Sequence, residues 1–431
     1  MNFDIATGRA LFAGRDGVGH ALYRAYKRDW QPRLGLAWTP ARWRQRVVVR
    51  GAYSASSYQE GTGTNLRLTL NPPFFNEFEL INSNPAVVGP SIGTGFDALR
   101  EKDPLVGTIL RAWDPNLRPG RAQQWNVTIE RQLARNLAFT IGYVAQRGTH
   151  LVVPVNADQR PAPGAPRPLD TIYQQIAGVS LTASIGHQQY DALQATLRKR
   201  FAGGWEFVSA YAWSRGMGDG RGFFSEGGQT AEPASFWPDP RNQQAEWGPL
   251  PFDARHNLTT AAIVDLPFGR GRRWLNTAPR WVDCVAGGWT MAAISKIHTG
   301  FPLTITAPDQ SQTGARSARP DQIASAEGAR EVGLGHQWFN TSAFVLPKLG
   351  TFGNAGVGVI RGPGLRVIDA SATKKVSRIG RAAIEVRADA FNVLNTPVFN
   401  APDRSLTSST FGQVLSSQLA REVQLSARLL F

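Results

Sequence analysis

The end of the chain, residues 422–431 (EVQLSARLLF), is the stretch that most constrains the fold. Its apolar residues fall on one side of a period-two pattern and its polar residues on the other: Val423, Leu425, Ala427, Leu429 and Phe431 against Gln424, Ser426 and Arg428. Such alternation is typical of a half-buried strand. In water, an apolar edge strand ending in an aromatic residue invites aggregation. In a bilayer, the apolar face of such a strand contacts lipid and the polar face lines a water-filled lumen. The terminal aromatic ring then lies at the membrane–water interface.

Ten further segments are predicted to be strands, and they come in pairs. They are residues 33–40 and 46–57, 122–133 and 137–147, 190–200 and 205–214, 255–266 and 288–299, and 365–376 and 381–393. The phase of 205–214 is ambiguous, because Phe207, Tyr211 and Trp213 compete with Val208, Ala210 and Ala212. With residues 422–431, the total is about eleven antiparallel strands.

The connections between these segments alternate in length. They are short after the first, third, fifth and ninth strands, moderate after the seventh, and long after the even-numbered ones. Residues 1–32, 58–121, 148–189, 215–254, 300–364 and 394–421 are expected to be loops, with a short strand within 303–306. Short periplasmic turns and long outer loops characterise outer-membrane barrels. A soluble β-sandwich would not segregate its loops by length in this way. We therefore predict an all-β, transmembrane antiparallel barrel with long extracellular loops.

Composition agrees with one turn-rich β domain spanning residues 1–431. The chain has 42% hydrophobic and 18% charged residues, 44 Gly, 28 Pro and 13 Trp, and no linker of low complexity divides it. Residues 1–14 lack the basic and apolar regions of a signal peptide, so none is expected. No apolar run approaches the ~18 residues of a membrane-spanning helix. Cys284 is the only cysteine, which excludes a disulfide within one chain.

The formal net charge of +15 raises the question of a polyanionic partner. The densest basic cluster is RGRRW, residues 270–274. Arginine is otherwise scattered through strands and turns, and no run of five or six like charges occurs. We therefore expect no nucleic-acid partner.

The candidate site residues all have structural explanations. His256 and His298 lie on separate strands and lack a third metal ligand. The glycines of 269–271 and 356–358 are turn glycines, too short for a dinucleotide fingerprint. Glu385, Arg387 and Asp389 share one strand face, where they compensate each other's charges. We predict no catalytic, cofactor or metal residue, and Cys284 is expected to be passive.

The tryptophans near strand ends have a different explanation. Trp38, Trp125, Trp205, Trp213 and Trp289 are expected to form an interface girdle. The alternative is that they are core aromatics of a soluble β protein.

Seven stretches together resemble the Oar-like TonB-dependent transporters of the bacterial outer membrane. They are residues 123–151 (QQWNVTIERQLARNLAFTIGYVAQRGTHL), 190–219 (YDALQATLRKRFAGGWEFVSAYAWSRGMGD), 252–274 (FDARHNLTTAAIVDLPFGRGRRW), 288–305 (GWTMAAISKIHTGFPLTI), 361–376 (RGPGLRVIDASATKKV), 387–402 (RADAFNVLNTPVFNAP) and the final strand. The resemblance implies a barrel of ~22 strands around a plug domain. About half of that barrel, and no plug, is recognised here.

The resemblance also implies the partners. They are outer-membrane lipid, the β-barrel assembly machinery through the strand ending in Phe431, and the TonB energising complex only if a plug is supplied by other sequence. The first hypothesis is thus the carboxyl-terminal part of an outer-membrane transporter for a large solute, not competent for transport alone. The alternative is a surface binding or adhesion β protein without transport. A carbohydrate-active enzyme lacks a candidate carboxylate pair.

Overall fold

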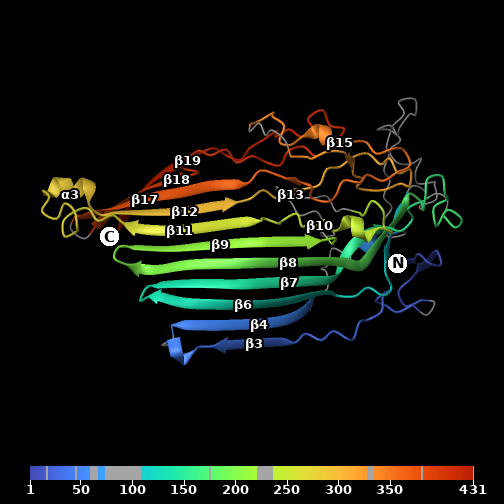
Figure 1. The fold of residues 1–431 in the computed structure, drawn as a ribbon, viewed down its shortest axis with the longest axis horizontal. Coiled ribbons are helices and arrows are strands. Elements are labelled where there is room, and N and C mark those ends of the chain that lie inside the picture. Colours follow the sequence, from blue (N-terminus) through green and yellow to red (C-terminus); the bar gives the residue numbers. More distant parts are fainter. Residues whose placement is uncertain are drawn as a thin grey trace.

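A computed structural model describes residues 1–15, 18–43, 46–58, 67–72, 108–173, 176–220, 236–327, 333–379 and 382–430. Its dominant feature is one antiparallel sheet whose eleven long strands lie side by side in chain order (Figure 1). They are β3 (Arg33–Trp38), β4 (Val47–Tyr58), β6 (Gly120–Ala134), β7 (Leu137–Asn156), β8 (Gly178–Ala202), β9 (Trp205–Gly218), β11 (His256–Asp265), β12 (Trp289–His298), β17 (Leu365–Ile379), β18 (Ala382–Phe391) and β19 (Glu422–Leu430). The eleven predicted strands are confirmed. Phe431 lies outside the described residues.

Each strand pairs with its neighbour in the sequence, so the sheet is a meander with β3 and β19 at its two edges. The tight turns gather at one end, called here the turn end, and the long connections at the other, the loop end (Figure 1). The β8–β9 turn requires glycine, because Gly203 and Gly204 have φ of 67° and 85°. Two successive positive φ values are those of a type I′ hairpin turn, whose twist matches that of the strands.

Two strands are much longer than the sequence pattern predicts. β7 and β8 run through residues 148–156 and 178–189, which were expected to be loop, and a third strand, β5 (Ile109–Trp113), pairs with β8 in parallel. These extensions lack clean alternation because both of their faces are covered: Val152, Val153, Val155, Val179 and Ala183 are all buried. Burial on both faces removes the period-two signal. At ~3.3 Å per residue, β8 is ~80 Å long.

The amino-terminal residues are also more ordered than expected. β1 (Asn2–Asp4) and β2 (Arg9–Leu11) form a small hairpin, and Phe3 packs with Leu110, Leu169 and Val179 in a buried cluster. The buried Asn2 side chain accepts a hydrogen bond from the Trp113 amide (2.7 Å) and donates one to its carbonyl oxygen (3.0 Å). The Asn2 side chain therefore makes the pair of backbone hydrogen bonds to Trp113 of β5 that a neighbouring strand would otherwise make. The amino terminus therefore lies at the loop end, and the carboxyl terminus at the turn end (Figure 1).

The remaining elements are short. They are α3 (Arg280–Ala286), the 3-10 turns η1 (Ala41–Trp43), η2 (Arg67–Leu70), η3 (Gln243–Glu246) and η4 (Thr341–Ala343), and the strands β10 (Gly248–Pro249), β13 (Pro302–Leu303), β14 (Asp321–Gln322), β15 (Phe344–Val345) and β16 (Ile360–Arg361). β13 shares only Leu303 with the short strand predicted within 303–306. α3 lies in the β11–β12 connection, for which the sequence predicted a moderate length but no helix. No helix among the described residues is long and apolar enough to span a membrane.

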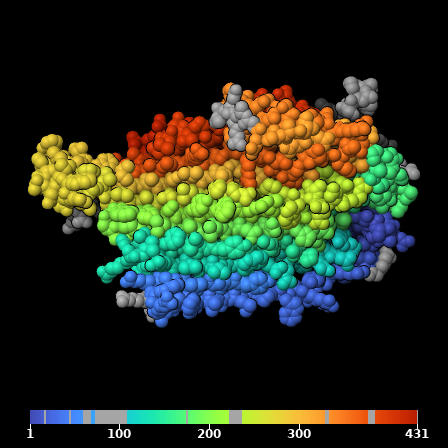
Figure 2. All heavy atoms as spheres, in the orientation of Figure 1, coloured from blue at the N-terminus to red at the C-terminus, as the bar shows by residue number. Residues whose placement is uncertain are grey.

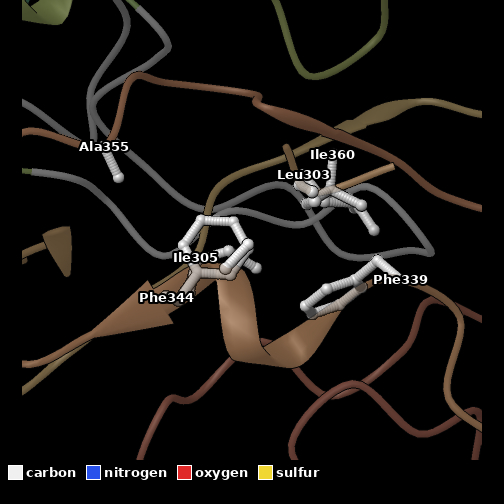
Figure 3. Close-up of a cluster of buried hydrophobic side chains, with 8 residues drawn as sticks. Leu303, Ile305, Phe339, Phe344, Ala355 and Ile360 are labelled. Carbon is white, nitrogen blue, oxygen red and sulfur yellow. The ribbon is translucent and has the colours of Figure 1, made fainter. Parts of the chain in front are cut away.

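The long connections at the loop end pack into a layer with a core of its own. Residues 300–364 and 394–421 are called here the outer-loop layer. Leu303, Ile305, Phe339, Phe344 and Ile360 are buried together (Figure 3). Phe411 of the second segment packs edge-on against Phe339, with ring centroids 5.3 Å apart. Burying each such side chain contributes about 1.5–3 kcal/mol.

A buried ion pair joins the outer-loop layer to the segment before β10. Arg319 donates to both carboxylate oxygens of Glu246, at 2.8 and 2.9 Å, and the two side chains are only 6% and 1% exposed. The Nη2 atom of Arg319 also donates a hydrogen bond to the Ala245 carbonyl oxygen (3.2 Å). Such a bidentate pair fixes the mutual orientation of the two segments.

Replacement of Glu246 by Gln should therefore loosen both segments. The change leaves the Arg319 guanidinium buried without its charge partner, which costs about 3–5 kcal/mol. Hydrogen exchange should show faster opening of residues 300–364. The matched control is Asp239→Asn, which breaks the Asp239–Arg241 pair, whose side chains are 23% and 45% exposed; it should cost less than about 1 kcal/mol. Equal effects of the two substitutions would contradict the assignment.

Asp403 gives the outer-loop layer a dependence on pH. Burial acts to raise its pKa, but hydrogen bonds from the Ser408 and Thr410 hydroxyls and the Ser405 and Arg404 amides outweigh burial and lower the pKa below its ordinary 3.8. The folded pKa is therefore lower than the unfolded one. The carboxylate stabilises this loop above the unfolded pKa, and that stabilisation is lost as the pH falls through the folded value.

Protection factors from hydrogen exchange around residues 403–413 should accordingly fall as the pH is lowered below about 4. The Asp403→Asn variant should have lower protection at neutral pH and no such dependence. Protection of the unsubstituted chain that stays constant down to pH 3 would show that the carboxylate does not hold the loop.

Candidate functional site

The main sheet has one apolar face, and its register places the apolar residues of successive strands side by side. One continuous row runs through Val49, Ile129, Ile141, Ala195, Tyr211, Leu258 and Ile297. A second row runs through Ala293, Ala370, Ala390 and Val423. Large side chains of these rows are exposed: Ile129 to 44%, Ile297 to 38% and Val423 to 63%. The phase of β9, left open by the sequence, is set by pairing: Trp205, Phe207, Tyr211 and Trp213 lie on the apolar face.

Charged residues bound this apolar face along two strands. On β8, Asp191 and Lys199 lie on it with Leu193, Ala195 and Leu197 between them; on β17, Arg366 and Lys374 enclose Ile368, Ala370 and Ala372. Both intervals are eight residues, or ~26 Å along a strand and ~20 Å after the usual tilt of a barrel strand. That height is close to the apolar band, ~25 Å tall, of an outer-membrane barrel.

Aromatic residues accompany the charges at both boundaries. Toward the loop end, Arg147 pairs with Asp191 (3.1 Å), its guanidinium lies 5.2 Å from the centre of the Trp125 ring, and the Tyr143 hydroxyl donates to Asp191 (2.5 Å). Toward the turn end, the Lys199 ammonium lies 4.0 Å from the Trp205 ring centre. Rings that are apolar in body and polar at the edge suit a membrane–water interface.

The opposite face of the sheet is polar. Arg50 pairs with Glu130 across β4 and β6 at 2.9 Å. On β18, Arg387 binds both carboxylate oxygens of Asp389 (2.9 Å from Nε), and Glu385 lies opposite Arg428 of β19. At these positions the charges compensate each other within and between strands.

A cavity of about 480 Å³ opens on the polar face at the turn end, beside the β6–β7 turn. Arg46, Arg135, Arg198 and Arg200 line it, with Glu130 as the acidic residue. Among the described residues, no carboxylate lies within ion-pair distance of these four arginines. The cavity is therefore electropositive and attracts anions into this part of the polar face.

The two histidines that might have shared a metal are on opposite faces of the sheet. His256 lies on the apolar face, where its Nδ1 is 2.8 Å from the Tyr211 hydroxyl. His298 lies on the polar face opposite Asn257, and its ring centre is 5.0 Å from that of Phe301. Within the described residues, no group of three or more His, Cys, Asp and Glu could hold a metal ion.

The remaining candidates lie in turns or at strand ends. Gly269, Gly271 and Gly358 have positive φ and lie in turns. Cys284 is exposed on α3. Trp38 ends β3, while Trp205 and Trp289 begin β9 and β12, so these three mark the turn end of the sheet. Trp125 and Trp213 lie nearer the loop end.

Sequence reasoning missed the two lysines of the turn-end boundary, Lys199 and Lys374. Both occupy apolar positions of their strands, which looks like a break in the pattern. Each lies eight residues after another charge in the same phase, Asp191 or Arg366. That spacing is the signal that could have found them.

A family model described as "Outer membrane beta barrel domain" matches residues 1–424. No curated protein matches the chain. Similar solved structures include the outer membrane transporter YddB from Escherichia coli (8% identity, TM-score 0.46), the siderophore receptor PiuA from Acinetobacter baumannii (9%, 0.43) and the FrpB iron transporter from Neisseria meningitidis (10%, 0.41). They cover 89%, 93% and 93% of this chain, which spans only 38%, 35% and 39% of theirs.

Superpositions this loose do not distinguish one barrel from another, so the assignment rests on the family model and on the two faces of the sheet. The model matches nearly the whole chain, and an exposed apolar band with charged and aromatic boundaries is what a membrane-spanning β-sheet requires. The chain therefore belongs to the outer membrane beta barrel domain family, with its place in the outer membrane.

Proposed function

We propose that this chain supplies eleven neighbouring transmembrane strands of a TonB-dependent, Oar-like outer-membrane transporter for a large solute. The observation that carries the proposal is the open sheet. Among the described residues, β3 and β19 each have a strand partner on one side only. An unpaired backbone edge in hydrocarbon costs several kcal/mol per polar group. The sheet is thus suited to a larger barrel, to which other strands contribute.

The faces of the sheet support a role in transport. The apolar band meets lipid, and the polar face would line the lumen through which a solute passes. The outer-loop layer would recognise the solute, because loops on a rigid scaffold commonly carry recognition. The β-barrel assembly machinery would engage the final strand, β19. TonB would act only through a plug, which these strands do not include. The role is not enzymatic.

One observation favours the second candidate, a surface binding or adhesion protein without transport. The outer-loop layer has its own buried core around Ile305 and Phe339, so it could present a stable surface whatever the barrel does. The gene sequence upstream of Met1 separates the two. A continuous reading frame that encodes a plug supports transport, whereas a signal peptide placed directly before this chain supports the alternative.

Labelling with a bilayer-restricted reagent should distinguish the two faces of β19. In a Cys284→Ser background, Leu425→Cys should react strongly and its neighbour Gln424→Cys weakly, because successive side chains of a strand point to opposite faces. In denaturant, both variants should react equally with a water-soluble maleimide. Preferential labelling at residue 424 would reverse the lipid and lumen faces and remove the basis of the proposal.

The purified 431-residue chain should give no steady single-channel conductance in a planar bilayer, because an open sheet does not enclose a pore. Coexpression with strands that complete the barrel should give a closed barrel. That barrel should show a defined conductance, or, if it is plugged, resistance to denaturant. A steady conductance from the chain alone would show that the strands close by themselves or by association, and would refute the half-barrel proposal.

A further inference from the structure

The β11–β12 connection is built differently from the other turns at its end of the sheet. Residues 266–288, called here the turn-end segment, contain α3 and protrude past the strands (Figures 1 and 2). By contrast, β6–β7 and β8–β9 are joined by residues 135–136 and 203–204 alone. The basic cluster RGRRW lies in this segment, and the barrel fold by itself does not require it.

Two contacts fix the turn-end segment to the lipid-facing side of the sheet. The Lys374 ammonium, on the apolar face of β17, donates to the carbonyl oxygens of Gly287 (2.5 Å) and Val285 (3.2 Å) at the carboxyl end of α3. The Trp289 indole donates to Val285 as well (2.9 Å), and its ring lies 5.1 Å from the Lys374 ammonium. Lys374 is therefore only 8% exposed although it sits on the lipid face.

The turn-end segment exposes large apolar side chains from that position. Trp281 and Val285, one helical turn apart on α3, are 72% and 69% exposed. Trp274 and Leu275 are 50% and 45% exposed. Exposed tryptophan and aliphatic side chains beside a bilayer are typical of an interfacial anchor.

The turn-end segment is strongly basic. Arg270, Arg272, Arg273 and Arg280 are all exposed, and none has a carboxylate partner among the described residues. The segment's acidic residue, Asp283, is half-buried and accepts a hydrogen bond from the Arg270 amide (2.7 Å). The turn-end segment therefore combines four exposed arginines with four exposed apolar side chains.

We propose that the turn-end segment is a binding site for anionic phospholipid of the periplasmic leaflet. The apolar side chains would enter the headgroup boundary and the guanidinium groups would hold phosphate, adding to the attraction of a negatively charged leaflet. Lipid is favoured over a soluble polyanion because Lys374 and Trp289 bind the segment directly to the face that already meets the bilayer. This site does not depend on whether the barrel transports a solute.

Cys284 provides the test, because it is exposed on α3 and is the only cysteine of the chain. The full chain, labelled there with an environment-sensitive fluorophore, is placed in nanodiscs of phosphatidylcholine with and without phosphatidylglycerol. With phosphatidylglycerol, we expect a blue-shifted emission, protection from acrylamide quenching, and quenching by lipids spin-labelled near the headgroup. High salt should weaken all three effects, since it screens surface charges.

The double variant Arg272→Gln/Arg273→Gln should shift the label toward water. The equilibrium constant for insertion should fall by roughly fivefold for each arginine removed. The control is Arg241→Gln, an exposed arginine in the β9–β11 connection at the loop end, which should have no effect. A parallel assay in native outer-membrane fragments measures the reaction of Cys284 with a bulky aqueous maleimide, which the double variant should accelerate. Two results would overturn the proposal: a water-like emission in both kinds of nanodisc, or an insertion of the label that is the same with and without phosphatidylglycerol.

Discussion

The structure depends on a constraint imposed by hydrocarbon: a backbone that crosses it must satisfy its hydrogen bonds within the protein. Among the described residues, every strand of the meander has a neighbour on both sides except β3 and β19, which lie at its edges. Once the backbone is paired, each residue faces either lipid or the lumen side, and strict alternation follows. The row from Val49 to Ile297 and the row from Ala293 to Val423 are the direct result.

The membrane-spanning part could be predicted from the sequence because its physics is local. Each strand has one face toward lipid and one toward the lumen side. The alternation of apolar and polar residues therefore identifies β6 or β19 from its own sequence alone. The ambiguity of β9 arose because Val208, Ala210 and Ala212 put apolar residues on both faces, and only the pairing of Tyr211 with Leu258 and Ala195 resolved it. The tight β8–β9 turn was legible from its two glycines for the same local reason.

The loop end could not be predicted in this way, because its order comes from contacts between residues far apart in the chain. The pairing of Arg319 with Glu246, and of Phe339 with Phe411, leaves no periodic signal. The extensions of β7 and β8 are buried on both faces and so resemble irregular apolar segments. α3 was missed because it is a single short helix in a segment rich in glycine, proline and arginine. Lys374, whose role is to hold α3, looked like an interruption of its strand.

The length of β8 has a mechanical consequence. A strand of ~80 Å, inclined as barrel strands are, rises ~60 Å, whereas a bilayer with its headgroups is ~40–45 Å thick. The parts of β7 and β8 that extend beyond the bilayer are hydrogen-bonded to each other, and β5 pairs with β8 there. We expect this extension to be rigid. Whatever docks at its top does so well clear of the lipid surface, and force applied there passes through continuous backbone pairing into the membrane wall.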